Sequence, residues 1–369
     1  MLPRATRVYL AAMADSLLPA LVDGARVTIF SLEALEGRHF QRIEHPRVAY
    51  RMGRHSARGR RGERELQQLV EALHPEVYWS ADPLIRPPNW AHGHRPRVVF
   101  AVEELRHFLR PQDFSWWERL RWRWVARARL LAADVVVCPT HALQVGLIAQ
   151  LGLALRRRTQ VVMNGIRPIF RQHSPEEVLE VRRRWLVPQR YVLMVENEGA
   201  QEALAVPLQA LARSEEVSSL TCVIVGREAL ADALRETVRT CHLEGMVRFL
   251  PIEYLAAADL SALYSGAMVV FEPTRGVDFR PTIGQSLACG TPVICAAGET
   301  NEELFGAAVM RVHPTDPAEW SKAFMALMLS GALREKFRAR GAACVAERTW
   351  TGSVKAAFAV GRRLVEGTP

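Results

Sequence analysis

Polar side chains able to bind an anion gather within residues 276–293, whose sequence is GVDFRPTIGQSLACGTPV. Arg280, Thr282 and Gln285 stand near the beginning of a helical stretch, directly after a turn. A helix N-terminus offers unpaired N–H groups and a partial positive charge, and a guanidinium can hold a phosphate through two hydrogen bonds. The segment therefore predicts a phosphate-binding site.

The elements that would position this site alternate along the chain. Short β-branched runs are separated by helical stretches, a pattern typical of parallel sheets covered by helices. The predicted strands form two series, which are 26–30, 47–51, 76–80, 97–102, 134–139 and 160–165, then 191–196, 220–226, 246–251, 267–273 and 291–297. The polar segment 171–190 lies between the two series, so we expect two similar α/β domains with a cleft between them.

Composition narrows the class of protein. With 369 residues, of which 49% are hydrophobic and 24% charged, the chain is long enough for two globular domains. No run reaches the roughly 20 apolar residues of a membrane span. The cysteines and histidines lack metal-ligand spacing, so we expect reduced thiols, a cytoplasmic location and no metal.

A helix is expected near the N-terminus. Apolar residues recur there at helical spacing, at Leu10, Met13, Leu17 and Leu21. Asp15 interrupts the apolar stretch and no clean cleavage site follows it. A signal peptide is therefore not predicted.

Positive charge is concentrated in the first half of the chain. Residues 1–170 carry 26 arginines against 15 acidic residues, a net charge of +11, whereas residues 171–369 carry −2. This asymmetry predicts a face that meets phospholipid head groups, a phosphorylated acceptor or a nucleic acid. A nucleic acid is disfavoured, because the basic residues are not interleaved with stacking aromatic residues in a known nucleic-acid motif.

Two basic segments could form that face. In residues 51–73, arginines crowd a loop that opens a helix, at Arg51, Arg54, Arg58, Arg60, Arg61 and Arg64. The loop is either simply solvated or docks an anion. In residues 114–134, an apolar helical stripe is expected to pack into the core, formed by Trp117, Leu120, Trp124, Ala128 and Leu131. Trp116 and Trp122 lie off this stripe beside arginines, which suits either a bilayer interface or ordinary helix packing.

Stretches along most of the chain resemble glycosyltransferase family 4, the group 1 glycosyltransferases. They include AADVVVCPTHAL (132–143), VVMNGIRPIFR (161–171), YVLMVENEGAQEALAVPLQAL (191–211), LSALYSGAMVVFEPT (260–274) and SLACGTPVICAAGETNEEL (286–304). The resemblance implies the α/β GT-B fold, in which two Rossmann-like domains face each other across a cleft. It also implies a nucleotide-sugar donor as substrate and no cofactor.

The same resemblance suggests how the chain is divided. Residues 1–170 would form an N-terminal domain on the acceptor and membrane side, and residues 171–348 the C-terminal domain that binds the nucleotide sugar. Residues 349–369 would form a C-terminal helix that packs back on the N-terminal domain.

The chain departs from the family where the donor diphosphate is held. The family usually has an arginine and a lysine after the first strand of the C-terminal domain, and these positions are Gln201 and Glu202 here. Arg280 replaces a usual glycine and is the expected substitute, with Arg275 and Arg227 as further candidates. A salt bridge from Arg280 to a neighbouring acid is the alternative.

The family's acidic residues are also replaced. Two glutamates separated by seven intervening residues fall on Val277, beside Asp278, and on Gln285. A His-Asp pair becomes Glu103–Glu104. The resemblance therefore implies catalytic contacts with the sugar or acceptor by Asp278, Glu103 and Glu104, and with the ribose by Gln285. Three further residues complete the expected donor site: Phe279, Thr282 and Gly284.

Two functions remain open. The chain is either a retaining glycosyltransferase with an altered donor clamp, acting on a lipid-linked or polysaccharide acceptor, or an inactive GT-B protein that acts as partner or scaffold of an active glycosyltransferase. An anionic membrane surface, on the inner face of the plasma membrane, is the expected docking partner. The residues expected to dock there are Arg54, Arg58, Arg60, Arg61 and Trp116.

Overall fold

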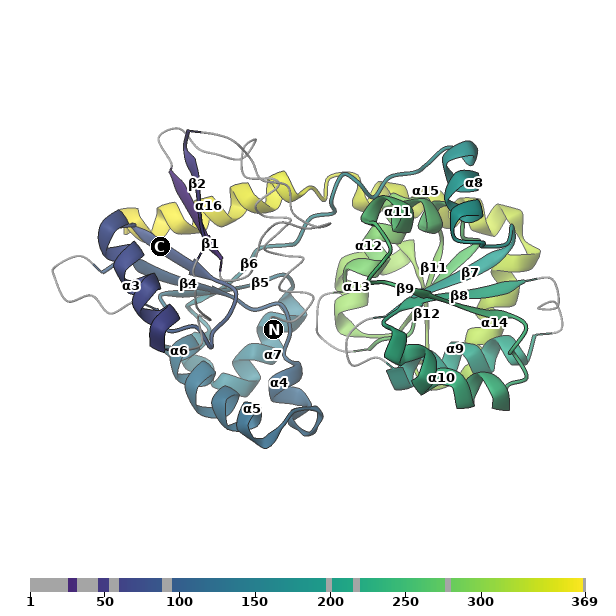
Figure 1. The fold of residues 1–369 in the computed structure, drawn as a ribbon, viewed down its shortest axis with the longest axis horizontal. Coiled ribbons are helices and arrows are strands. Elements are labelled where there is room, and N and C mark those ends of the chain that lie inside the picture. The colour runs from purple at the N-terminus through teal and green to yellow at the C-terminus, as the bar shows by residue number, and fades with distance from the viewer. Residues whose placement is uncertain are drawn as a thin grey trace. The chain divides into compact units, whose positions relative to one another are not determined.

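The computed structural model describes residues 26–31, 46–52, 60–87, 95–196, 201–214, 220–275 and 280–367 (Figure 1). The chain divides into two compact units. The first joins Met1–Gly165 to Thr349–Pro369, and the second joins Ile166–Gly276 to Arg280–Arg348. The helix expected at residues 10–21 lies outside the described ranges.

The first unit is an α/β layer structure. Its strands are β1 (Val27–Ser31), β2 (Val48–Met52), β3 (Val77–Ser80), β4 (Arg97–Ala101), β5 (Val135–Cys138) and β6 (Thr159–Val161). Its helices are α3 (Arg60–Leu73), α4 (Arg106–Leu109), η1 (Pro111–Asp113), α5 (Trp116–Leu120), η2 (Arg121–Ala126), α6 (Arg127–Ala132), α7 (His141–Leu151), η3 (Leu153–Leu155) and α16 (Trp350–Glu366). All the described strand pairs are parallel.

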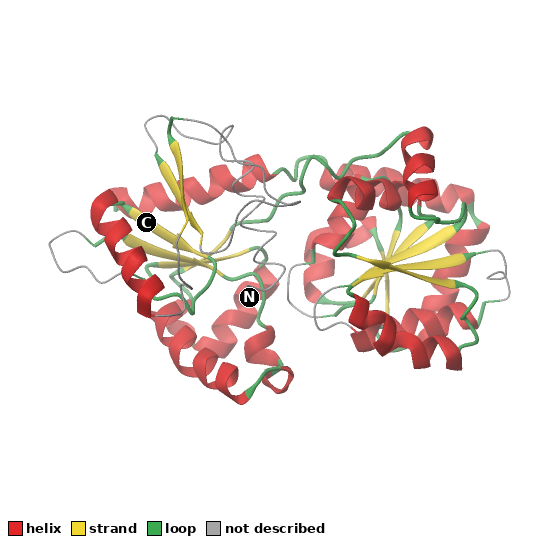
Figure 2. Ribbon diagram, viewed as in Figure 1, coloured by secondary structure: helices red, strands yellow, loops and turns green. Residues whose placement is uncertain are grey.

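Strands β3, β4, β5 and β6 form one sheet in that order, with helices on both faces (Figure 2). Successive side chains of a strand point to opposite faces. Val98 and Phe100 therefore pack with α6 and α7, whereas Val99 and Ala101 pack with α16. The first series of predicted strands does not form a single sheet in the described ranges, because β1 and β2 pair with each other.

The second unit is a doubly wound domain. Its strands are β7 (Tyr191–Val195), β8 (Thr221–Gly226), β9 (Val247–Pro251), β10 (Val269–Glu272), β11 (Val293–Ala296) and β12 (Met310–Val312). Its helices are α8 (Pro175–Arg184), α9 (Gln201–Ala212), α10 (Glu228–Thr240), α11 (Ala257–Gly266), α12 (Pro281–Ala288), α13 (Glu299–Phe305), η5 (Gly306–Ala308), α14 (Pro317–Leu329) and α15 (Gly331–Val345).

The six strands of the second unit form one parallel sheet in the order β12-β11-β10-β7-β8-β9. Its central strands β7 and β10 are buried throughout and apolar except for Glu272 at the end of β10, as expected where both faces are covered. Figure 1 shows α9, α10 and α14 on one side of this sheet and α11 and α12 on the other. β12 was not predicted, because three residues give too short a pattern.

The helical segment α5–η2–α6 corrects one prediction. Trp117, Leu120 and Trp124 are 60%, 44% and 64% exposed, so the predicted core stripe is wrong. The buried residues are instead Trp122, Ala126 and Leu130, which lie four positions apart. Both faces of this helix are apolar in sequence, and the face carrying the small Ala126 is the one that packs inward, against Leu84 and Phe108.

None of the helices in the described ranges is both long and apolar enough to cross a bilayer.

Candidate functional site

The strand order of the second unit reverses between β7 and β10. β7 pairs with β8 on one side and with β10 on the other, and the chain proceeds outward from this pair in both directions. In doubly wound sheets, ligands bind beyond the carboxyl ends of the strands at such a switch point. Glu196 directly follows β7, and Thr274 and Arg275 follow β10. These residues mark a candidate ligand site.

Glu196 is buried at this edge and holds Arg227, the first residue after β8. Glu196 Oε1 accepts hydrogen bonds from Arg227 Nη2 at 2.7 Å and Nε at 3.2 Å, and Oε2 accepts from the Arg227 backbone N–H at 2.7 Å. A Cβ at Gly226 would lie 2.5 Å from Leu230 Cδ2 and 3.0 Å from Glu196 Oε2, so the glycine makes room for both side chains. Sequence reasoning missed Glu196, although a charged residue directly after a buried strand was a signal.

Helix α12 begins next to the end of β10. Arg280 is its half-buried N-cap and Pro281 occupies the first helical position, where a missing N–H costs nothing. Thr282 is buried and Gln285 half-buried. A Cβ at Gly284 would lie 3.1 Å from Ile166 Cδ1, so this glycine serves close packing.

The remaining predicted donor-site residues are described only in part. Asp278 and Phe279 lie outside the described residues. Gln201 begins α9, but its side chain is not among those that the structure describes. Glu202 follows in the first turn and is exposed. Arg275 is exposed and forms no ion pair within the described part of the chain.

The residues expected to dock on a membrane are also described only in part. Arg54 and Arg58 lie outside the described ranges. Arg60 begins α3, and Arg61 is exposed in its first turn. Trp116 is 62% exposed.

In the first unit, polar residues meet at the carboxyl edge of the sheet. Glu103 comes after β4, Thr140 after β5 and Asn164 after β6, and all three are buried. Asn164 Nδ2 lies 2.5 Å from Glu103 Oε2. Thr140 caps α7, since its Oγ1 accepts from the Leu143 N–H at 3.1 Å. Glu103 and Asn164 therefore form the polar centre of this edge.

Burial keeps Glu103 largely protonated. Its pKa is raised to about 8, first by burial and then by the nearby charge of Glu104, while the bond to Asn164 opposes the rise. Asn164 Nδ2 donates this hydrogen bond to Glu103 Oε2, whereas Asn164 Oδ1 is buried without a partner among the described residues.

Glu104 points to different neighbours. Its Oε1 lies 3.9 Å from Nδ1 of His107, and the His107 ring stacks on Phe114 and on Trp122, each at 4.0 Å between ring centres. The side chains of the two adjacent acids predicted as catalytic, Glu103 and Glu104, therefore point to different neighbours. Of the two, only Glu103 forms a hydrogen bond with Asn164. His107 was not singled out by the sequence.

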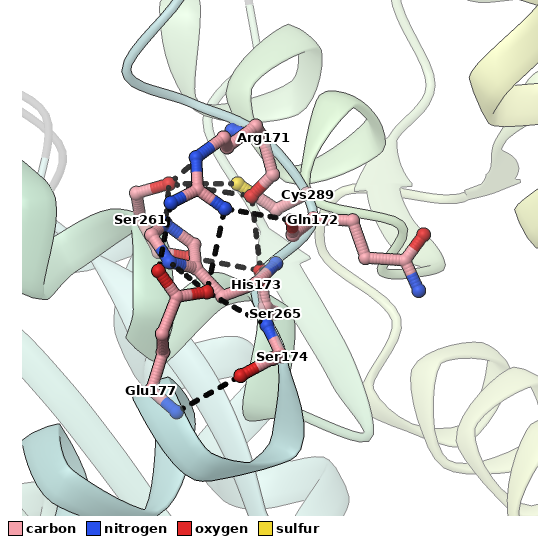
Figure 3. Close-up of polar contacts among 8 residues, drawn as sticks. All are labelled: Arg171, Gln172, His173, Ser174, Glu177, Ser261, Ser265 and Cys289. Carbon is pink, nitrogen blue, oxygen red and sulfur yellow. Dashed lines mark hydrogen bonds and ion pairs between the residues drawn. The ribbon is translucent and has the colours of Figure 1, made fainter.

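A third polar cluster has a structural role (Figure 3). His173 Nε2 lies 2.9 Å from Ser261 Oγ on α11, and His173 Nδ1 lies 3.2 Å from Glu177 Oε2 on α8. Arg171 also binds Glu177, which lowers the pKa of that carboxyl to about 2. Ser261 is fully buried and beyond the reach of a substrate. The cluster therefore fastens the segment before α8 onto α11.

Metal ligands do not gather in the described ranges. No group of three histidine, cysteine, aspartate or glutamate residues there could hold a metal ion.

The family model of the glycosyl transferases group 1 matches residues 180–343. That segment is a group 1 glycosyl transferase domain. It includes β7, β8, β10 and α12, and therefore the whole described edge at the switch point of the second unit. The family predicted from the sequence motifs is confirmed.

Two curated relatives are similar to parts of this chain. O-antigen chain mannosyltransferase B of Escherichia coli is 27% identical over 181 residues, covering 48% of this chain and 47% of the relative. D-inositol 3-phosphate glycosyltransferase of Kineococcus radiotolerans is 30% identical over 148 residues, covering 37% of this chain and 33% of the relative. The matches thus span between a third and a half of the relatives' lengths.

Solved structures are similar over nearly the whole chain. Anabaena HepE in complex with UDP-glucose has a TM-score of 0.73 at 18% identity, covering 99% of this chain and 97% of that chain. Sucrose-phosphate synthase from Thermosynechococcus elongatus has a TM-score of 0.74 at 17% identity, covering 98% and 93%. WaaG, a glycosyltransferase involved in lipopolysaccharide biosynthesis, has a TM-score of 0.70 at 13% identity, covering 98% and 96%. The predicted GT-B fold is confirmed by these likenesses.

Proposed function

We propose that this chain transfers a sugar from a nucleoside diphosphate sugar to a lipid-linked or polysaccharide acceptor, with retention at the anomeric carbon. The observation that carries the proposal is the switch point between β7 and β10, inside a group 1 glycosyl transferase domain. The description of HepE as a complex with UDP-glucose supports a nucleotide-sugar donor.

The donor diphosphate is held by an altered clamp in this proposal. Arg280 at the start of α12 and exposed Arg275 after β10 supply the positive charge that Gln201 and Glu202 lack. Charge builds on the diphosphate as the sugar departs, so preorganised cations and helix N–H groups stabilise the transition state.

The other donor contacts follow the family resemblance. Gln285 binds the ribose, since an amide both donates and accepts hydrogen bonds. Asp278 and Phe279 contact the sugar, and Thr282 offers a hydroxyl near the start of α12. Gly284 supports the site by letting α12 pack closely on Ile166.

Glu103 contacts a hydroxyl of the acceptor or of the sugar in this proposal. A carboxyl whose pKa is about 8 exchanges a proton near neutral pH, which suits it to a reacting hydroxyl. Glu104, held near His107, assists through its charge, which raises the pKa of Glu103.

A second candidate function is an inactive partner or scaffold of another glycosyltransferase. Two observations favour it: Glu202 is exposed where the family has a cation, and the Arg227 guanidinium is engaged by Glu196. Both would weaken the binding of a diphosphate.

Calorimetric titration of the full chain with UDP-, GDP- and ADP-sugars separates the two candidates. The transferase proposal expects binding of one nucleotide class, followed by slow hydrolysis of that donor to the free sugar. Absence of heat with all three classes would leave the scaffold as the surviving candidate.

A further inference from the structure

The first unit exposes an unusual concentration of aromatic surface. Trp116, Trp117, Leu120 and Trp124 are 62%, 60%, 44% and 64% exposed on one continuous helix. At 3.6 residues per turn, Trp117, Leu120 and Trp124 share one side of that helix. We call these four residues the tryptophan face. It lies opposite the buried side of Trp122, so it has no core to pack on.

The tryptophan face is held in a defined conformation. Ser115 and Glu118 form a reciprocal capping box that fixes the start of the helix. The rings of Trp116 and Trp117 stack with their centres 3.8 Å apart. A π-helical turn, η2, begins directly after Leu120 and places Trp122 inward and Trp124 outward. The exposed rings are therefore presented by a capped and anchored helix.

The charges around the tryptophan face are almost all positive. Residues 106–132 contain seven arginines against two acidic residues, Asp113 and Glu118. Three of these arginines bind backbone carbonyls: Arg119 those of Phe114 and Gln112, Arg127 those of Gln150 and Leu151, and Arg129 that of Pro83.

Other arginines of the segment stay beside the face. Arg121 and Arg123 flank Trp124 along the helix, and Arg110 is exposed nearby in sequence. None of these three forms an ion pair in the part of the chain that is described. The Arg123 guanidinium lies 6.0 Å from the centre of the Trp124 ring, so charge and aromatic surface are contiguous.

We propose that the tryptophan face docks onto an anionic lipid bilayer. Tryptophan is favoured at the head-group level, where its apolar ring and polar N–H both find suitable surroundings. Arginine beside it adds attraction to lipid phosphates, whereas a single sign of charge gives no self-complementarity for a second copy of the chain. The capped, amphipathic helix lies in the plane of the interface.

This inference goes beyond the proposed function and does not depend on it. The sequence left Trp116 and Trp122 of this helix between a bilayer interface and ordinary packing, whereas the structure buries Trp122 and exposes Trp117 and Trp124. Lipid binding needs no nucleotide sugar, so the two proposals fail independently.

Co-sedimentation of the full chain with vesicles tests the docking. One set of vesicles contains phosphatidylcholine alone. The other contains phosphatidylcholine with about one third anionic lipid, supplied as phosphatidylglycerol. The chain is expected to bind the anionic vesicles, and high salt is expected to weaken the binding because it screens the charges. Absence of binding to anionic vesicles at low salt would overturn the proposal.

Paired variants locate the surface. Trp117→Ser with Trp124→Ser is expected to lower the partition coefficient roughly tenfold or more. Tyr254→Ser with Leu329→Ser removes exposed apolar side chains from the second unit and should leave binding unchanged. Equal effects of the two pairs would contradict the assignment of the face.

The arginines are tested in the same way. Arg121→Gln with Arg123→Gln is expected to lower the partition coefficient roughly fivefold per residue. Arg213→Gln with Lys336→Gln makes the same change of charge elsewhere and is the control. Unchanged binding by the first pair, with far-ultraviolet circular dichroism that matches the wild type, would refute the electrostatic contribution.

Discussion

Glu103 is a carboxyl group in an unusual environment, because it is buried beside a neutral amide. A carboxyl at 5% exposure that bonds a neutral amide has little to stabilise its charge, so it keeps its proton. Perturbed carboxyls of this kind concentrate at functional sites, which is why Glu103 is central to the acceptor side of the proposal.

The buried acid makes stability depend on pH in a specific direction. The pKa of Glu103 rises from 4.5 to about 8 on folding, so the folded chain binds the proton more tightly. Between these two values the unfolded chain ionises first, and the free energy of unfolding falls as pH rises, by about 1.4 kcal/mol per pH unit. Below pH 4.5 and above pH 8 this contribution is constant.

Glu103→Gln should remove this slope. Chemical unfolding of the variant and the wild type at pH 5 and at pH 7.5 measures the difference in stability at each pH. The variant is expected to gain relative to the wild type as pH rises, because glutamine does not ionise. A difference that stays constant between the two pH values would show that Glu103 is already ionised in the folded chain.

Individual elements were largely predictable. All eleven predicted strands are found, because β-branched apolar runs bounded by polar residues are a strong local signal. The burial of α5–η2 was not predictable in the same way. Both of its faces are apolar, and what selects the buried one is the space beneath Ala126, which is a tertiary property.

The site was predictable to a smaller extent. Motifs placed Glu103 after a predicted strand and Arg280 at the beginning of a predicted helix, where parallel α/β sheets bind ligands. The engagement of Arg227 by Glu196 was not foreseen, because the two residues are 31 positions apart and meet only when β7 pairs with β8. The divergence of Glu103 and Glu104 likewise depends on neighbours distant in sequence.

The close approach of α16 to β6 gives a test at the scale of elements. A Cβ at Gly165 would lie 2.2 Å from the Trp350 backbone nitrogen and 2.3 Å from the Thr349 carbonyl carbon. Gly165→Ala must therefore move backbone, and overpacking of this kind costs about 1–3 kcal/mol. Thermal unfolding should show a lower midpoint for this variant.

Gly245→Ala is the matched control for Gly165→Ala. A Cβ at Gly245 would meet no atom within 4 Å, so this substitution should change stability little. If the two variants unfold at the same temperature, the start of α16 is not packed against the end of β6 as described.

The whole molecule combines a basic first half with a nearly neutral second half. Its N-terminal 170 residues carry +11, and its second unit contains the group 1 glycosyl transferase domain. This division is consistent with an acceptor or lipid surface served by the first unit and a nucleotide sugar served by the second. The family's usual cations are absent from Gln201 and Glu202, so the account depends on arginines elsewhere.

The most direct measurement is calorimetric titration of the preferred nucleotide sugar into Arg280→Ala, with Arg213→Ala as the control. Arg213 is exposed on the second unit and is not part of the proposed site. A charge-assisted hydrogen bond contributes about 1.5–3 kcal/mol, so Arg280→Ala should weaken donor binding roughly tenfold to a hundredfold, and the control should bind as the wild type does. Donor affinity that survives Arg280→Ala unchanged would contradict the altered clamp.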